Sequence, residues 1–268
     1  YLKRLIAGGY ERVYEFARCF RNEGIAPSHL QEFTMLEYYC AFWNYKDNMN
    51  FTERLLKHTI EKVTGGLVLE HGEHQIDFSG DWPRVTIQEL IEKDCGIKLD
   101  EHESVEELRK VIREKGLHID NLDSLGKGNL IDQLYKLVSR PKLIQPTFLI
   151  SHPVELSPLA RQNDDNPQIC DRFQLVVNTW EVLNAYSELV DPWEQRKRLE
   201  EQAALRTGGD DEAMVMDEDY LLCMEHGMPP ISGWGMGIER FMALITNQDN
   251  LKDTVLFPLM RPLKSEVE

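Results

Sequence analysis

The feature that most constrains the fold is a glycine-rich run near one end of the chain, followed at once by an apolar stretch. Residues 233–237 read GWGMG, and residues 238–246 read IERFMALIT. The glycines match the GxGxxG pattern of dinucleotide-binding folds poorly, and no strand–helix–strand unit with an acidic residue about 20 positions later surrounds them. We therefore predict a strand whose glycines let a flat ring or a backbone approach closely, followed by a helix over 238–246.

A second stretch, at the other end of the sequence, is expected to meet the first in space. Residues 20–24 read FRNEG and open a polar hairpin loop over 21–28, and residues 31–42 return as a strand. Because side chains alternate along a strand, Phe33, Met35, Glu37 and Tyr39 share one face. A buried carboxylate is costly unless it is paired, so we expect Glu37 to face a site or a partner.

The segments between these two stretches alternate between strand and helix patterns. Residues 84–140 are charged and follow helical spacing, which predicts a helical insertion on the surface of the main domain. Thr86 and Glu89 form a capping-box pattern at its start. The remaining predicted elements are paired strands at 5–7 and 13–16, a helix at 45–63, a strand pair within 68–78, strands at 142–150, 173–177 and 180–189, a helix at 192–205, an acidic turn at 208–211 and a short helix at 217–226.

Composition narrows the class of protein. The chain has 268 residues, 42% of them hydrophobic, and no apolar run approaches the ~20 residues of a membrane span. Its five cysteines are scattered without CxxC spacing, which indicates reduced thiols, a cytoplasmic setting and no zinc site. A net charge of −16 argues against nucleic acid as the sole partner but allows a local basic patch. Because the chain opens with Tyr1 rather than Met, we expect it to be a fragment.

The charged and aromatic residues of the two stretches suit a nucleoside triphosphate, its metal and a cationic substrate. Arg21 can contact phosphate or carboxylate in a bidentate manner, and a solvated loop arginine is the alternative. Phe33 is either a core residue or, opposite Arg240, one side of a clamp for adenine. The segment 180–189 adds three polar side chains, for which a solvated position is the alternative: Glu181, Asn184 and Glu188.

Taken together, these motifs resemble the catalytic domain of class II lysyl-tRNA synthetases. Residues 20–39 resemble motif 2 of that family, and residues 235–240 with 256–258 resemble motif 3. Lysine-type segments are found at 142–147, 153–160, 187–189 and 209–214. The resemblance implies an α+β fold with the class II antiparallel sheet flanked by helices. It also implies one catalytic domain over 1–268, with the helical insertion at 84–140 within it.

The resemblance also implies an activity and its partners. Lysine and ATP would give lysyl-adenylate and pyrophosphate, and the lysyl group would pass to the 3′ end of tRNA(Lys) in the cytoplasm. Mg²⁺ would be the cofactor, and no membrane would be involved. The N-terminal anticodon-binding domain, motif 1 and a glutamate expected just before Tyr1 are absent from this sequence. Since motif 1 builds the family's dimer interface, a homodimer is expected of the full-length parent.

Roles for individual residues follow from the same resemblance. Arg21 and Arg240 would be catalytic. ATP would be bound by Arg21, Glu23, His29, Phe33, Glu181 and Arg240. Lysine would be bound by Glu37, Tyr39, Asn184 and Glu188. Glu181 and Gln174 would hold the metal, although Gln174 stands where the family has a second glutamate and brings an amide oxygen without charge.

Two other functions remain open at this point. A paralogue could transfer lysine to a protein such as elongation factor P, but such paralogues usually lose the SEL and GDDEAM segments present here at 187–189 and 209–214. A non-catalytic regulatory relative is compatible with Gln174. The four intact residues Arg21, Glu181, Glu188 and Arg240 argue against it.

Overall fold

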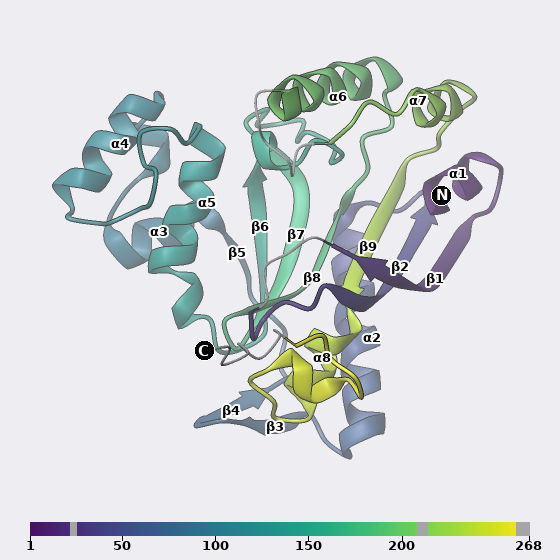
Figure 1. Cartoon of the computed structure of the whole chain (residues 1–268), viewed down its shortest axis with the longest axis vertical. Helices are drawn as coiled ribbons and strands as arrows, with labels where there is room; N and C mark the ends of the chain where they lie inside the picture. Colours follow the sequence, from purple (N-terminus) through teal and green to yellow (C-terminus); the bar gives the residue numbers. More distant parts are fainter. Residues whose placement is uncertain (22–25, 208–213, 261–268) are drawn as a thin grey trace, which may run out of the picture.

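The computed structural model of the chain describes residues 1–21, 26–207 and 214–260, and a seven-stranded sheet runs through its centre (Figure 1). The strand order is β1-β2-β9-β8-β7-β6-β5, and all neighbours are antiparallel except β5 and β6. The strands are β1 (Arg12–Phe20), β2 (Glu32–Ala41), β5 (Arg84–Thr86), β6 (Thr147–Pro153), β7 (Ile169–Val177), β8 (Trp180–Ser187) and β9 (Ile231–Gly237). The predicted α+β class with a mainly antiparallel sheet is confirmed.

The two sequence stretches that were expected to meet are neighbours at the middle of this sheet. β2 pairs with β9 so that Glu37 lies opposite Gly235 and Tyr39 lies opposite Gly233. On its other side β9 pairs with β8, where Gly235 lies opposite Asn184. Three strands from distant parts of the chain therefore present one continuous face.

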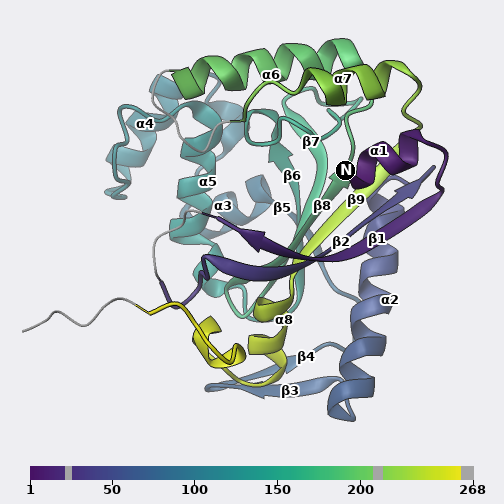
Figure 2. The same cartoon turned by 45° about the vertical axis from the view of Figure 1, so that its right-hand side comes forward.

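Eight α-helices surround the sheet (Figures 1 and 2). They are α1 (Leu2–Ala7), α2 (Tyr45–Thr64), α3 (Ile87–Cys95), α4 (Val105–Glu114), α5 (Lys127–Val138), α6 (Pro192–Thr207), α7 (Glu218–Glu225) and α8 (Ile238–Ile245), counted over the described residues. α6 and α7 lie at one end of the sheet and α8 lies at the other, next to the hairpin of β3 (Val68–His71) and β4 (His74–Asp77). α3, α4 and α5 form a group beside β5 and β6.

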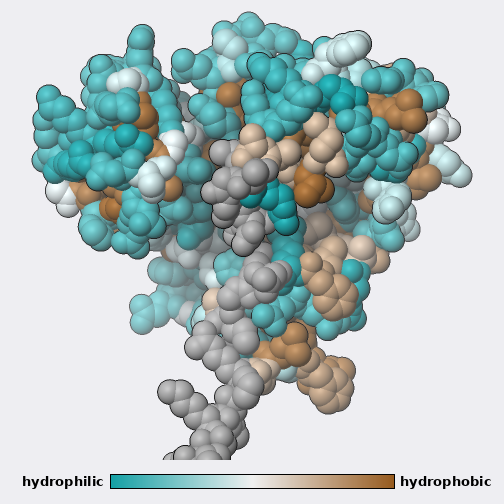
Figure 3. Space-filling view, turned by 45° about the horizontal axis from the view of Figure 1, so that its top comes forward, coloured by the Kyte–Doolittle hydropathy of each residue, from teal (hydrophilic) through white to brown (hydrophobic). Residues whose placement is uncertain are grey.

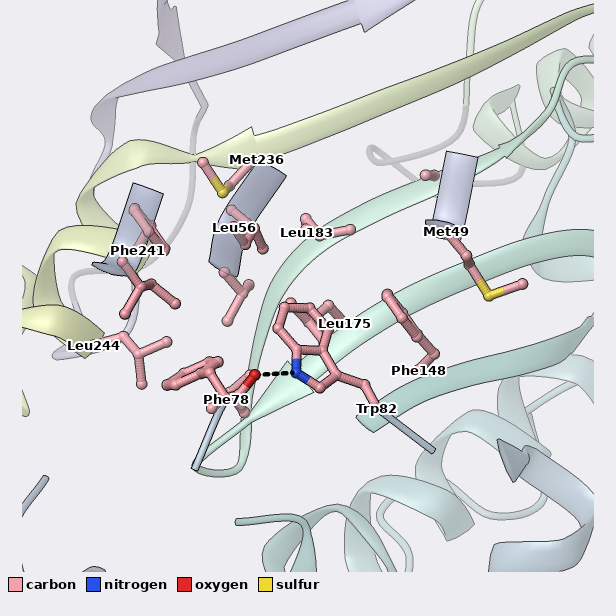
Figure 4. Close-up of a cluster of buried hydrophobic side chains, with 14 of the residues drawn as sticks. Met49, Leu56, Phe78, Trp82, Phe148, Leu175, Leu183, Met236, Phe241 and Leu244 are labelled. Atoms are coloured by element: carbon pink, nitrogen blue, oxygen red, sulfur yellow. Dashed lines mark hydrogen bonds between the residues drawn. The ribbon is translucent and has the colours of Figure 1, made fainter. Parts of the chain in front are cut away.

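The main hydrophobic core fills the space between α2 and the sheet. Figure 4 shows Met49 and Leu56 of α2 facing Leu175 and Leu183 of the sheet. Further along the same core, the indole Nε1 of Trp82 donates to the carbonyl of Phe78 at 3.2 Å, so this buried polar atom is satisfied. The opposite face of β2, β8 and β9 is left for polar residues, because side chains alternate between the two faces of a strand.

A second core lies within the α3, α4 and α5 group. Ile91, Leu108 and Ile112 are fully buried there. Leu149 of β6 and Val176 of β7 belong to the same cluster, so the helices pack against the edge of the sheet through these two residues.

The helix boundaries have local causes. The predicted capping box at the start of α3 is present, with Glu89 N donating to Thr86 Oγ1 at 3.0 Å and Thr86 N donating to Glu89 Oε2 at 2.8 Å. Asn44 and Asp47 form a similar box at the start of α2. Gly65 ends α2 with φ of 82°, a left-handed conformation that glycine adopts without strain.

Three sequence predictions need correction. Residues 5–7 belong to helix α1 and not to a strand. The helix buries Ile6 against the sheet, and its Lys3 and Arg4 side chains pair with acidic residues of other segments. Residues 84–86 form the edge strand β5, and the helices of that region begin at Ile87. The strand predicted from 142 begins at Thr147, because residues 140–142 form a 3₁₀ turn. The acidic turn predicted at 208–211 lies outside the described residues.

The surface is mainly polar. Most of the face shown in Figure 3 is hydrophilic, with apolar residues in small groups. The five cysteines are free thiols, two of them buried and three partly buried. Within the described residues, none of the helices combines the length and the apolar character that crossing a membrane requires.

Candidate active site

A cavity of about 290 Å³ lies on the polar face of β2, β8 and β9. The structure brings nine of the predicted site residues to its wall: Arg21, His29, Phe33, Glu37, Tyr39, Glu181, Asn184, Glu188 and Arg240. Glu23 lies outside the described residues. Gln174 lines a neighbouring cavity.

One end of the cavity is built from carboxylates and phenols. The Tyr39 hydroxyl donates to Glu37 Oε1 at 2.6 Å, which confirms that Glu37 faces a polar site. Glu188 follows β8 directly and is almost completely buried. The absence of a side chain at Gly233 allows Glu188 and Tyr39 to pack closely against β9. A Cβ at this position would lie 2.2 Å from Glu188 Oε1 and 2.4 Å from Tyr39 Cε1. The glycine of β9 is therefore required by the close approach of two site side chains.

Glu188 has a partner that the sequence did not indicate. The Lys3 Nζ of α1 lies 2.6 Å from Glu188 Oε2 and also near the faces of three tyrosine rings, at 5.7–5.8 Å from their centroids. The rings belong to Tyr39, Tyr186 and Tyr220. The ammonium thus sits inside an aromatic and acidic enclosure, which is a favourable environment for a cation.

Burial shifts the titration of this end of the cavity. It raises the pKa of Glu188 to about 7, against the opposing effect of the Lys3 ammonium. Burial also raises the pKa of Tyr186 to about 12 and the pKa of Tyr39 well above its usual value. The phenols are therefore neutral near pH 7, and the groups of this end that can carry a charge are Glu37, Glu188 and Lys3.

The other end of the cavity carries two arginines and an aromatic ring. The guanidinium of Arg21 lies over the Phe33 ring at 5.3 Å from its centroid. Arg240, in the first turn of α8, donates to the Glu181 carbonyl at 2.9 Å and to the Ser28 carbonyl at 3.4 Å. These hydrogen bonds hold the Arg240 side chain at the cavity wall, where a planar cation suits a phosphate or a flat ring.

Glu239, the neighbour of Arg240, ties the start of α8 to β2. Its carboxylate accepts twice from the backbone N–H of Thr34, at 2.8 and 2.9 Å. A carboxylate in the first turn of a helix is also favoured by the helix dipole. The start of α8 is thereby fixed against β2, and Arg240 is placed relative to Phe33.

A smaller cavity of about 220 Å³ lies beside the first, between the sheet and α5. Glu181 borders both cavities, whereas Gln174 borders the smaller one. Arg172 and Asn184 lie between them, with the Arg172 Nε donating to Asn184 Oδ1 at 2.8 Å. Since β7 is one strand further out than β8, its side chains face this second space.

The donor set suits a loosely held magnesium ion. Within the described residues, no group of three or more His, Cys, Asp or Glu side chains is arranged to hold a metal. Glu181 could offer one carboxylate and Gln174 one amide oxygen, and the remaining ligands would be phosphate oxygens and water. Mg²⁺ tolerates such a shell, because it gives up its water reluctantly and often binds through substrate phosphates.

Comparison with known proteins connects this geometry to one family. The profile of the family described as tRNA synthetases class II (D, K and N) matches residues 1–261. The chain belongs to this family of class II tRNA synthetases. The curated relatives include proteins called Lysine--tRNA ligase from Bacillus cytotoxicus (43% identical over 97% of this chain and 52% of the relative), Azobacteroides pseudotrichonymphae (45%, 98% and 52%) and Thermosipho africanus (42%, 100% and 52%). The chain spans about half the length of these relatives.

Sequence reasoning missed three polar residues in this class II synthetase chain. Lys3 was overlooked because residues 5–7 were interpreted as a strand, although a buried Glu188 required a cationic partner. Glu239 and Arg172 were overlooked because single charged residues next to predicted site residues carry little signal. A search for the partner of each buried carboxylate or amide is the signal that could have found them.

Proposed function

We propose that the chain is the catalytic part of a lysine--tRNA ligase, which activates lysine with ATP and transfers it to tRNA(Lys). The observation that carries the proposal is a single cavity with an acidic, phenol-lined end and an arginine- and Phe33-lined end. The first end suits an ammonium side chain and the second suits a nucleotide. The similar relatives are called Lysine--tRNA ligase, which agrees with the proposal.

In the first step the lysine carboxylate attacks the α-phosphorus of ATP, and the bond from that phosphorus to the leaving pyrophosphate breaks. We place Arg21 at the α-phosphate and the substrate carboxylate, where a planar cation offsets the charge of both reactants. Phe33 and Arg240 would enclose the adenine ring, and Glu23 and His29 would also contact ATP. Positioning and charge neutralisation are the main contributions of the protein to such a reaction.

The lysine substrate would lie between this region and the acidic end. Asn184 would hold its carboxylate. Glu188 and Tyr39 would receive its ε-ammonium, with Glu37 beside them. In the second step a terminal ribose hydroxyl of the tRNA attacks the lysyl carbonyl carbon, and AMP leaves with the electron pair of the broken acyl–phosphate bond.

Mg²⁺ would neutralise the phosphates of ATP in the first step. We place it near Glu181 and Gln174, which supply one charged and one neutral oxygen. The protein's own part in this arrangement is to orient Glu181, whose backbone carbonyl is already fixed by Arg240.

The organisation of the intact protein is part of the proposal. Residues 1–268 would form one catalytic domain with a helical insertion at 84–140. The hydrophobic cluster that joins α3, α4 and α5 supports a compact helical unit that begins at Ile87 and packs on Leu149 and Val176 of the sheet. The parent protein would act as a homodimer in the cytoplasm. The free thiols are compatible with that reducing compartment.

Lysine-dependent exchange of pyrophosphate into ATP by the intact protein tests the first step. Exchange with lysine and not with other amino acids is expected, and Glu188→Ala should weaken the use of lysine by at least ~2 kcal/mol, as truncation of a buried charge partner usually does. Charging of tRNA(Lys) then separates a tRNA ligase from an enzyme that modifies elongation factor P. Absence of lysine-dependent exchange would remove both activities.

A further inference from the structure

We propose that Lys3 is a positioning and specificity-determining residue of the amino-acid pocket, in which its ammonium is the fixed counter-ion of Glu188. Glu37 and Glu188 together carry one carboxylate more than Lys3 can neutralise, and the ammonium of the substrate would neutralise this remaining charge. This inference rests on the proposed function, because it assumes that the acidic end of the cavity receives the lysine side chain.

The geometry makes the Lys3–Glu188 pair a permanent part of the pocket. The two side chains are 12% and 1% exposed, and their charged atoms are 2.6 Å apart. Lys3 projects from the same face of α1 as the buried Ile6, three residues later, so the packing of the helix aims the ammonium inward. A buried carboxylate of this kind is strongly disfavoured without a partner.

A count of charges shows what the pair leaves for the substrate. The groups that face Glu188 are Lys3 from α1, Glu37 and Tyr39 from β2, Tyr186 from β8 and Tyr220 from α7. The raised phenol pKa values keep the tyrosines neutral near pH 7. Counted as formal charges of these described residues, two carboxylates and one ammonium leave one negative charge, which is carried in full when the pH lies above the Glu188 pKa of about 7.

Arg172, a further cation beside this pocket, is directed elsewhere. Arg172 lies close enough to Tyr186 to affect its titration, but its guanidinium donates to Asn184 Oδ1, to the Leu156 carbonyl and to Ser157 Oγ. It is thus held at the wall between the two cavities. Arg172 is therefore engaged with groups other than Glu37 and Glu188.

This charge balance selects the substrate side chain. A singly charged ammonium completes the balance, a neutral side chain leaves a carboxylate without a counter-ion, and an acidic side chain adds repulsion. Without Lys3, the carboxyl groups of Glu188 and Glu37 would face each other with no fixed ammonium beside them, and the pKa of Glu188 would rise further, because the Lys3 ammonium lowers it. Glu188 would then no longer be a charged and oriented acceptor for the substrate.

The test compares two variants of α1 in the intact protein. Lys3→Met keeps the length and apolar stem of the side chain, and Arg4→Met is the matched control, since Arg4 pairs with the carboxylates of Asp217 and Asp219 near the surface. In pyrophosphate exchange, Lys3→Met should raise the KM for lysine about tenfold or more and leave the KM for ATP within about twofold, as expected when one partner of a buried charge pair is removed. Arg4→Met should leave both constants within about twofold, as expected for exposed pairs.

Chemical rescue distinguishes a missing charge from a disturbed helix. Lys3→Ala removes a propylammonium group, so added n-propylamine should lower the KM for lysine in this variant and should not do so in the wild type. n-Propanol, which has the same length without the charge, should have no effect. Lys3→Ala also provides a test if Lys3→Met folds poorly. Its KM for lysine is measured with and without n-propylamine in one preparation, so each measurement has its own internal reference.

The outcomes separate the inference from the proposed function. An unchanged lysine KM in Lys3→Met overturns the inference, as does a lowered KM, which would mean that Lys3 competes with the substrate for Glu188. Failure of n-propylamine to act on folded Lys3→Ala also counts against it. If the wild type shows no lysine-dependent exchange at all, the proposed function fails first.

Discussion

At the scale of single residues, two carboxylates determine the chemistry of the cavity, the half-buried Glu37 and the buried Glu188. Glu37 receives a hydrogen bond from the Tyr39 hydroxyl, whereas Glu188 receives the Lys3 ammonium. Each acid therefore has a different partner. Burial raises the pKa of Glu188 to about 7, close to physiological pH.

The raised pKa of Glu188 predicts a pH dependence of lysine use. An acid with a raised pKa is protonated below that value, and a neutral Glu188 attracts an ammonium poorly. We therefore expect kcat/KM for lysine to fall by up to about tenfold per unit as the pH drops below 7, the slope of one titrating group. The measurement is pyrophosphate exchange between pH 5.5 and 8.5. Glu188→Gln should lose this acid limb and be less active throughout, and an unchanged limb in that variant would assign it to another group.

A second residue-scale prediction concerns the metal. Gln174→Glu adds one negative charge beside Glu181 in the smaller cavity, so the Mg²⁺ concentration for half-maximal exchange should fall from roughly the millimolar range of a site with one carboxylate. Gln168→Glu, the same change at an exposed position before β7, is the control and should not move the midpoint. Superimposable Mg²⁺ titrations of wild type and Gln174→Glu would refute the argument.

At the scale of elements, β9 links the hydrophobic core to the cavity. On its core face Trp234 stacks on Tyr38 of β2, with ring centroids 4.9 Å apart. Asn48 of α2 donates to Ser232 Oγ at 2.9 Å and to the Gly233 carbonyl at 3.2 Å. On the cavity face the strand carries glycines. Packing and hydrogen bonds on the core face thus hold β9 in place, and the glycines on its cavity face leave space for ligands.

The glycines of β9 are predicted to differ in their tolerance of a methyl group. Gly233→Ala should force apart Glu188 and Tyr39, which a Cβ would meet at 2.2 and 2.4 Å, and should both raise the KM for lysine and destabilise the fold by about 1–3 kcal/mol. Gly235→Ala is the matched control for stability, since its Cβ would first meet Met35 Sδ at 3.5 Å. Urea unfolding of both variants is the measurement. Equal midpoints would show that the strand moves to accept either change.

The whole molecule contains two cores that share the edge of one sheet. The first joins α2 to the sheet, and the second holds α3, α4 and α5 together. Contact between them passes through β6 and β7, where Leu149 and Val176 turn toward the helices. Regions with separate cores can open separately, so local stability is expected to differ between them.

Ile112→Ala tests this division. The side chain is fully buried in the second core, so its truncation should cost about 2–5 kcal/mol of local stability. Hydrogen exchange followed by mass spectrometry should show lost protection over 87–138 with little change in β8 and β9. Val111→Ala, on the partly buried flank of the same helix, should have a smaller effect. Equal loss of protection across the sheet would mean that the two cores unfold as one unit.

The sequence alone determined the elements that have a strong local pattern. Alternation placed Phe33, Met35, Glu37 and Tyr39 on one face, and the glycines of 233–237 marked the strand beside them. The capping pair Thr86 and Glu89 fixed a helix start. In each case the signal depends on near neighbours in the chain, so it can be read without knowing the fold.

The tertiary structure decided what depends on partners far apart in the sequence. A short apolar run at 5–7 fits a strand or a helix, and the helix prevailed because it buries Ile6 while Lys3 reaches Glu188. Gln174 and Glu181 are close in sequence, yet Gln174 faces the smaller cavity because β7 lies one strand further out than β8. Buried charges are matched by whichever segment the fold brings to them, and local sequence patterns carry no record of that partner.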